Sequence, residues 1–90
     1  MIARIEWDDR KARANLTKHS VSFEEAETVF GDPLIVVAPD PDHSESEKRE
    51  IAAGVSSHGR LLLISFTQRG DSVRLISARK LTPYERRLYE

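Results

Sequence analysis

The side chain best suited to acid–base chemistry in this sequence is His19. Imidazole exchanges protons near neutral pH, and His19 ends a predicted helix, where the helix dipole favours the charged form. Its neighbour Lys18 could hold a phosphate or shift the proton affinity of the imidazole. The alternatives are that His19, on one helical stripe with Ala12 and Leu16, is a hydrogen-bonded packing residue, and that Lys18 is a solvated lysine. We expect the two residues to form an acid–base group.

Three arginines form the expected phosphate-binding cluster: Arg49, Arg74 and Arg79. A guanidinium fork suits a phosphate better than an ammonium group does. Regular alternation along a strand would place Arg79 on one face with Val73 and Leu75, and Arg74 on the other. Only one of the two is then expected to line an open sheet face, although Arg79, at the strand end, could reach that face or brace a final helix.

Three more residues are possible supports for such a site. Glu47 could act as a base, but the acids next to it make a loop carboxylate a weaker choice. An ion pair of Arg49 with Glu47 or Glu50 is an equally weighted alternative to phosphate binding. Glu85 and Tyr89 could contribute an orienting carboxylate and a stacking ring, with helix capping and packing as the simpler roles.

Motifs of high specificity for other enzyme classes do not occur in the sequence. It has no P-loop, no GxGxxG, no GxSxG and no HExxH, which argues against kinases, dehydrogenases and hydrolases. His19, His43 and His58 lack the spacing of metal ligands, and there is no cysteine to assist them. We therefore expect neither a metal site nor a cofactor.

The elements that must position these residues begin with a strand over 3–7, which alternates polar and apolar side chains. A helix over about 9–19 follows, capped by Asp8 or Asp9. Ser22 and Glu25 predict a capping box for a second helix over 23–30, which Gly31 would end in a left-handed conformation. A short apolar run over 34–38 predicts another strand, followed by a mobile acidic loop over 39–50.

The C-terminal half predicts a meander. Three apolar segments, over 49–56, 60–67 and 72–79, are separated by turn residues. Thr82 and Glu85 form a second capping box with Pro83 at the first helical position, which predicts a final helix. The order β-α-α-β-β-β-β-α gives one α+β domain over residues 1–90, with a mostly antiparallel sheet, helices on one face and the other face partly open.

Composition and charge predict the cellular compartment of this domain and the kind of ligand that it attracts. The chain has 90 residues, a formal net charge of −1 and no cysteine, so we expect a small fold in a reducing cytoplasm, with neither a membrane span nor a signal peptide. Charge is unevenly distributed, with −7 over residues 24–50 and +4 over residues 51–90. Such a split could guide a polyanion to one region of a nearly neutral protein, although solvated surface charge is the simpler explanation.

Six segments, taken together, resemble the BrnT family over the whole chain and in the same order. They include Trp7-Asp8, residues 18–26, Val29-Phe30-x-Asp32, His43 through Arg49, residues 76–79 and Glu85-Arg86-x-x-Tyr89. One departure is Ser20, where the family usually has glycine; if that position needs a positive φ, serine costs about 1 kcal/mol. The resemblance implies a RelE-like fold and a bacterial ribonuclease toxin, neutralised by a DNA-binding BrnA-like antitoxin in a hetero-oligomer.

The expected activity is metal-independent cleavage of RNA, which carries its own nucleophile, the 2′-OH. The expected partners are RNA and the antitoxin, with operator DNA bound only through the antitoxin. An alternative of a different class is a non-catalytic module that binds a DNA-binding protein and acts with it as a transcriptional co-repressor. The sequence leaves open the RNA preference, any dependence on the ribosome, and which residue takes which proton.

Overall fold

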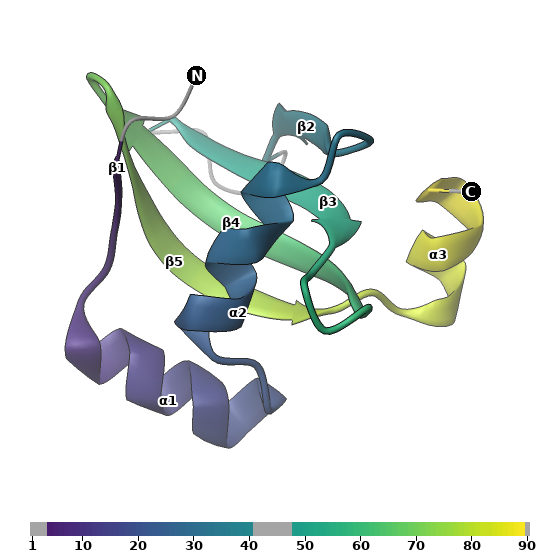
Figure 1. Cartoon of the computed structure of the whole chain (residues 1–90), viewed down its shortest axis with the longest axis horizontal. Coiled ribbons are helices and arrows are strands. Elements are labelled where there is room, and N and C mark those ends of the chain that lie inside the picture. The colour runs from purple at the N-terminus through teal and green to yellow at the C-terminus, as the bar shows by residue number, and fades with distance from the viewer. Residues whose placement is uncertain (1–3, 41–47, 90) are drawn as a thin grey trace.

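The strands of the computed structural model, which describes residues 4–40 and 48–89, form one sheet in the order β1-β5-β4-β3-β2 (Figure 1). They are β1 (Arg4–Glu6), β2 (Val36–Pro39), β3 (Arg49–Val55), β4 (Leu61–Arg69) and β5 (Ser72–Lys80). The pairs β2–β3, β3–β4 and β4–β5 are antiparallel, and β1–β5 is parallel. With helices α1 (Asp9–His19), α2 (Phe23–Thr28) and α3 (Pro83–Tyr89), the predicted α+β order is confirmed.

Helix α1 begins and ends as its sequence dictates. The Asp8 carboxylate accepts hydrogen bonds from the backbone N–H groups of Arg10 and Lys11, at 2.8 and 3.2 Å. At the other end, Ser20 adopts a left-handed conformation, with φ 58° and ψ 32°, and its N–H donates to the Leu16 carbonyl. Position 20 therefore does need a positive φ, which serine adopts at a cost that glycine would avoid.

Helix α2 is shorter than predicted, and its end differs in kind. After Thr28 the chain tightens into a 3-10 turn, η1 (Val29–Gly31), and Gly31 does not have a positive φ, so the predicted left-handed stop is wrong. Asp32 takes over the role of ending the helix. Its carboxylate accepts from the N–H groups of Leu34 at 2.9 Å and Val55 at 2.7 Å, which ties this turn to the end of β3.

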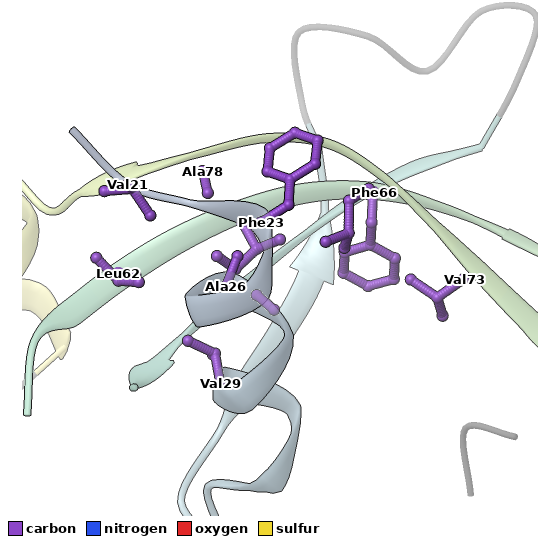
Figure 2. Packing of buried hydrophobic residues seen from close by; sticks show 11 residues of the cluster. Val21, Phe23, Ala26, Val29, Leu62, Phe66, Val73 and Ala78 are labelled. Atoms are coloured by element: carbon purple, nitrogen blue, oxygen red, sulfur yellow. The ribbon is translucent and has the colours of Figure 1, made fainter. Parts of the chain in front are cut away.

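The hydrophobic core lies between α2 and one face of the sheet (Figure 2). Phe23, Ala26 and Val29 are fully buried against residues of β4 and β5 that include Leu62 and Ala78. Helix α1 lies beside β5 in Figure 1, so α1 and α2 both pack on one face of the sheet, as predicted. A Cβ at position 54 of β3 would lie 3.0 Å from Val29 Cγ1, so a larger residue than glycine there would push against the buried Val29 side chain.

A β-bulge in β5 changes which residues share the other, open face. Ser65 pairs with Ser77 and Phe66 with Leu75, so Ile76 is an extra residue on β5. Leu75 and Ala78 are both buried toward the helices. Consequently Arg74 and Arg79 lie on the same, open face, and the prediction that they point to opposite sides is wrong. Regular alternation fails here because a bulge shifts the side-chain period by one residue.

Candidate functional site

Lys18 and His19 meet the bulge of β5 in a cleft, which we call the α1 cleft. It has a volume of about 260 Å³ and lies between α1 and β5. Its basic side chains are those of Lys11, Lys18 and His19, and opposite them lie Ile76 and Ser77. Within the part of the chain that the structure describes, no residue that lines the cleft is acidic. The cleft is smaller than a typical closed ligand pocket, as expected of a site that takes one segment of a polymer.

Asn15 sets the position of α1 against β5. Its side-chain amide donates to the carbonyls of Val21 at 2.9 Å and Ala78 at 2.8 Å, and its carbonyl oxygen accepts from the Ala78 N–H at 3.0 Å. The residue is buried, and its bonds satisfy an edge of β5 that faces no strand at this point. Asn15 therefore fixes the distance across the α1 cleft, a role that the sequence reasoning did not assign to it.

His19 is half-buried, and Lys18 is exposed beside it. Over residues 4–40 and 48–89, the His19 ring forms no hydrogen bond. This differs from the alternative interpretation, in which His19 is a hydrogen-bonded packing residue. The same helical stripe is only partly packed, since Leu16 remains 51% exposed. His19 lines the cleft together with Lys11 and Lys18, so an anion bound there would meet an imidazole and two ammonium groups.

Arg49 and Arg74 lie together in one row of the open face. Both pair in register with Thr67 of β4, one from each side. Glu6 is the next residue of this row, and its carboxylate lies 3.6 Å from Arg74 Nη1. Arg74 also helps to hold the pKa of Asp8 below its ordinary value, after the larger effect of the two backbone hydrogen bonds to that carboxylate. This row therefore borders the N-terminal end of α1, while Lys18 and His19 lie at the C-terminal end.

Arg79 stands apart from this row, because it pairs with Leu63, four residues along β4 from Thr67. At about 3.3 Å per residue the separation is about 13 Å, so the three arginines do not form one cluster. The Arg79 guanidinium donates two hydrogen bonds to the Glu85 carboxylate, at 2.8 and 2.9 Å. This pairing lowers the pKa of Glu85 to about 2 and raises that of Arg79.

Glu85 also completes the predicted capping box of α3. It accepts from the Thr82 N–H at 2.9 Å, and its own N–H donates to Thr82 Oγ1. Tyr89, at the other end of α3, donates its hydroxyl to the Leu34 carbonyl at 3.3 Å. Glu85 and Tyr89 thus hold the two ends of α3, while the remaining candidate, Glu47, lies outside the described residues.

The largest polar network of the described residues was not anticipated, because its members are far apart in sequence. Glu25 lies with 2% of its side chain exposed. It accepts from Ser56 Oγ at 2.6 Å and from Nε and Nη2 of Arg60, and His58 Nδ1 lies 3.2 Å away. The hydrogen bonds from Arg60 are the largest cause that lowers the pKa of Glu25 to about 2.

Because of this network, only one of the two hydrogen bonds of the predicted Ser22–Glu25 capping box forms. Ser22 Oγ accepts from the Glu25 N–H at 3.0 Å, as the capping box requires, but the Glu25 carboxylate faces the turn between β3 and β4 instead of returning to Ser22. Arg60 extends the network to the end of α1, since its Nη2 also donates to the Ser20 carbonyl at 3.1 Å. The residue after His19 is thereby fixed to the start of β4.

The described part of the chain contains neither a group of side chains that could hold a metal ion nor a helix that could span a membrane. Over residues 4–40 and 48–89, no three His, Asp or Glu side chains are arranged so that they could hold a metal ion. The helices described over the same ranges are too short and too polar to cross a membrane.

Comparison with known proteins places this geometry in a family. A family model described as ribonuclease toxin, BrnT, of type II toxin-antitoxin system matches residues 7–85. The crystal structure of the ribonuclease toxin BrnT from Brucella abortus is similar, with a TM-score of 0.69 and 23% sequence identity. The match covers 88% of this chain and 96% of that one, which shows a common fold. No curated protein matches the sequence.

Proposed function

The chain belongs to the BrnT family, the ribonuclease toxins of type II toxin–antitoxin systems, and from this premise we propose that it cleaves RNA in the α1 cleft without a metal ion. The observation that carries the proposal is the lining of that cleft. Lys11, Lys18 and His19 line it, none of the described residues that line it is acidic, and the imidazole is partly exposed there. A polyanion with its own nucleophile needs a proton-exchanging group and positive charge at the reacting phosphate, and this cleft offers both.

The proposed reaction is an intramolecular transfer. The 2′-oxygen forms a bond to phosphorus as the bond from phosphorus to the 5′-oxygen breaks, leaving a 2′,3′-cyclic phosphate and a 5′-hydroxyl. One proton leaves the 2′-OH and one must reach the 5′-oxygen. His19 exchanges one of these protons and solvent water exchanges the other, while the ammonium groups of Lys18 and Lys11 stabilise the charge on the phosphorane.

The arginines have different parts in this proposal. Arg79 has both ends of its guanidinium on Glu85, so it acts as a positioning residue that holds α3. Arg74 lies near Asp8 at the N-terminal end of α1, and Arg49 lies in the same row of the sheet, so both bind the RNA backbone away from the reacting phosphate. Cleavage of messenger RNA by this route would stop translation in the cytoplasm.

The proposed partner is a BrnA-like, DNA-binding antitoxin, through which alone the complex reaches operator DNA. Support comes from the family description, which implies an antitoxin, and from apolar surface that a partner would cover. Leu34, Val36 and Val37, at and before the edge strand β2, are 75%, 53% and 47% exposed. Covering them would raise the melting temperature of the toxin through binding linkage.

The decisive experiment incubates the purified, partner-free protein with RNA in the presence of a chelator. We expect cleavage to continue and to leave 2′,3′-cyclic phosphate ends, while DNA of the same sequence stays intact because it lacks the 2′-OH. His19→Ala should lower the rate by about 10² to 10⁴-fold.

His58→Ala is the matched control. His58 lies outside the α1 cleft, and 64% of its side chain is exposed. Removal of its imidazole should therefore leave cleavage unchanged. Products that end in a 3′-hydroxyl, or full activity of His19→Ala, would contradict the mechanism. Absence of both cleavage and growth arrest when the toxin is expressed alone would favour the non-catalytic co-repressor instead.

A further inference from the structure

A second basic cleft, which we call the α3 cleft, lies where β3 and β5 end and β4 begins. Its volume is about 480 Å³. Three cationic side chains line it, those of Arg60, Lys80 and Arg86, together with the ring of Tyr89. The rest of the lining is apolar or glycine: Val55, Gly59, Leu61 and Leu81. Among the described residues, none of those that line this cleft is acidic, although acids outnumber bases in the chain as a whole, 15 to 14.

The walls of the α3 cleft are held in place by contacts already described. Arg60 is fixed on one side by Glu25 and the Ser20 carbonyl. On the other side, α3 is held at its start by the Arg79–Glu85 pair and at its end by Tyr89 on the Leu34 carbonyl. Arg86 and Tyr89 are three residues apart on α3, so they share one face of that helix, as their common cleft requires. The cleft is therefore formed before any ligand binds.

The α3 cleft adjoins the α1 cleft along two connections. Ser77 lines the α1 cleft and Lys80 lines the α3 cleft. These two residues are three positions, or about 10 Å, apart on β5. The Ser20–Arg60 hydrogen bond links the residue after His19 to the wall of the second cleft. Since Ser77 and Lys80 lie on opposite faces of β5, the two basic clefts follow one another around the end of this strand, where a single-stranded polyanion could contact both.

We propose that the α3 cleft binds the RNA segment next to the cleavage point, with phosphates at Lys80 and Arg86 and a base stacked on Tyr89. The proposal rests on the proposed function, because it takes RNA as the ligand. An acidic segment of a protein partner is the competing occupant. RNA is favoured because the cleft combines cations with an aromatic ring and continues a second basic cleft. The exposed apolar side chains suited to a protein partner, those of Leu34, Val36 and Val37, lie outside its lining.

The test measures binding of a single-stranded 2′-O-methyl RNA oligonucleotide, which 2′-OH attack cannot cleave, to the partner-free protein. Arg86→Ala should weaken binding about five- to tenfold and reduce the dependence of binding on salt by about one phosphate contact. Arg87→Ala is the matched control, because Arg87 is equally exposed on the same helix but does not line the cleft. It should bind nearly as the wild type does.

A second pair of variants tests the stacking ring. Tyr89→Leu should weaken binding at least fivefold. Tyr89→Phe keeps the ring that meets the base but loses the hydrogen bond to the Leu34 carbonyl that holds α3, so it should restore part of the loss. Tyr84→Leu is the control on the same helix, since Tyr84 is 63% exposed and outside the cleft. Melting temperatures of all variants show whether each is folded.

The outcomes separate this proposal from the proposed function. If Arg86 and Tyr89 control affinity for the oligonucleotide but the protein cleaves no RNA, the α3 cleft stands and the nuclease does not. If RNA is cleaved while both cleft variants bind like their controls, the α3 cleft is not an RNA site. Weaker binding of purified antitoxin by Arg86→Ala, with RNA binding unchanged, would overturn the proposal and assign the cleft to the protein partner.

Discussion

Two arginine–carboxylate pairs join separate parts of this molecule, and they differ in sequence separation and in exposure. Glu25 and Arg60 are 35 residues apart, and the Glu25 side chain is 2% exposed. Arg79 and Glu85 are six residues apart, with side chains 36% and 30% exposed. The pKa of each glutamate is about 2, yet we expect the two pairs to differ in their contribution to stability, because water reaches both side chains of the second pair but only Arg60, 31% exposed, in the first.

The difference separates two roles. The buried pair joins α2 to the turn between β3 and β4 and reaches the end of α1, so the whole fold depends on it. The exposed pair holds a single helix, α3, at the end of β5. We therefore expect changes at Glu25 to affect global stability, and changes at Glu85 to affect α3 and the cleft that it borders.

Glu25→Ala is the strongest test of this comparison. It leaves Ser56 and Arg60 without their common acceptor, and we expect a loss of about 3 kcal/mol in the free energy of unfolding. For a domain of this size that corresponds to a fall in melting temperature of more than about 10 °C. Thermal unfolding at pH 7 measures it. Glu24→Ala, an exposed neighbour on the same helix, is the control, and equal melting of both variants would show that the buried pair is not required.

Acid should reveal the same pairs in the unmodified protein. Because the pKa values of Glu25 and Glu85 are about 2 when folded, against 4.5 ordinarily, unfolding takes up protons below about pH 4.5. Their contribution to stability is complete above that pH and is lost as the pH falls toward 2. Melting curves from pH 7 to 2.5 should show the decline, and Glu25→Gln and Glu85→Gln should each flatten it by a similar amount, because the two pKa shifts are similar. An unchanged slope in either variant would show that its carboxyl group does not stabilise the folded state through this shift.

Glu85→Ala should have a smaller and more local effect. It removes both the Arg79 pair and the acceptor for the Thr82 N–H, for a loss of about 1 kcal/mol. Hydrogen exchange should become faster in α3 while the strands remain protected. Glu85→Gln keeps an acceptor for Thr82 and should recover part of the protection. Faster exchange in β4 or α2 would mean that this pair also supports the core.

Ser20→Gly should give the smallest change and the opposite sign. Ser20 has a positive φ, which glycine adopts without strain, so we expect a gain of about 0.5 kcal/mol. The carbonyl that Arg60 binds is retained, since it belongs to the backbone. Chemical denaturation measures the gain, and a loss of stability would show that the Ser20 side chain contributes more than its backbone strain costs.

Much of the fold follows from neighbours in the sequence. Alternation predicted the first strand, and a short apolar run predicted the second. Asp8, Ser22 and Thr82 marked the helix starts, and apolar segments between turn residues predicted the meander. These features depend on residues within about four positions of one another, so a sequence pattern contains them. The resemblance to the BrnT family was readable for a related reason, because its motifs run in order along the chain.

Only the tertiary structure decided which side chains meet. The bulge at Ile76 puts Arg74 and Arg79 on one face, and packing of α1 against β5 brings His19 to Ser77. Likewise, Glu25 completes its own capping box only in part, because Arg60 and Ser56 offer its carboxylate stronger partners in the core. The sequence by itself determined the elements and the family. The site depended on the register of strands and on contacts between residues tens of positions apart, which packing of the whole chain selects.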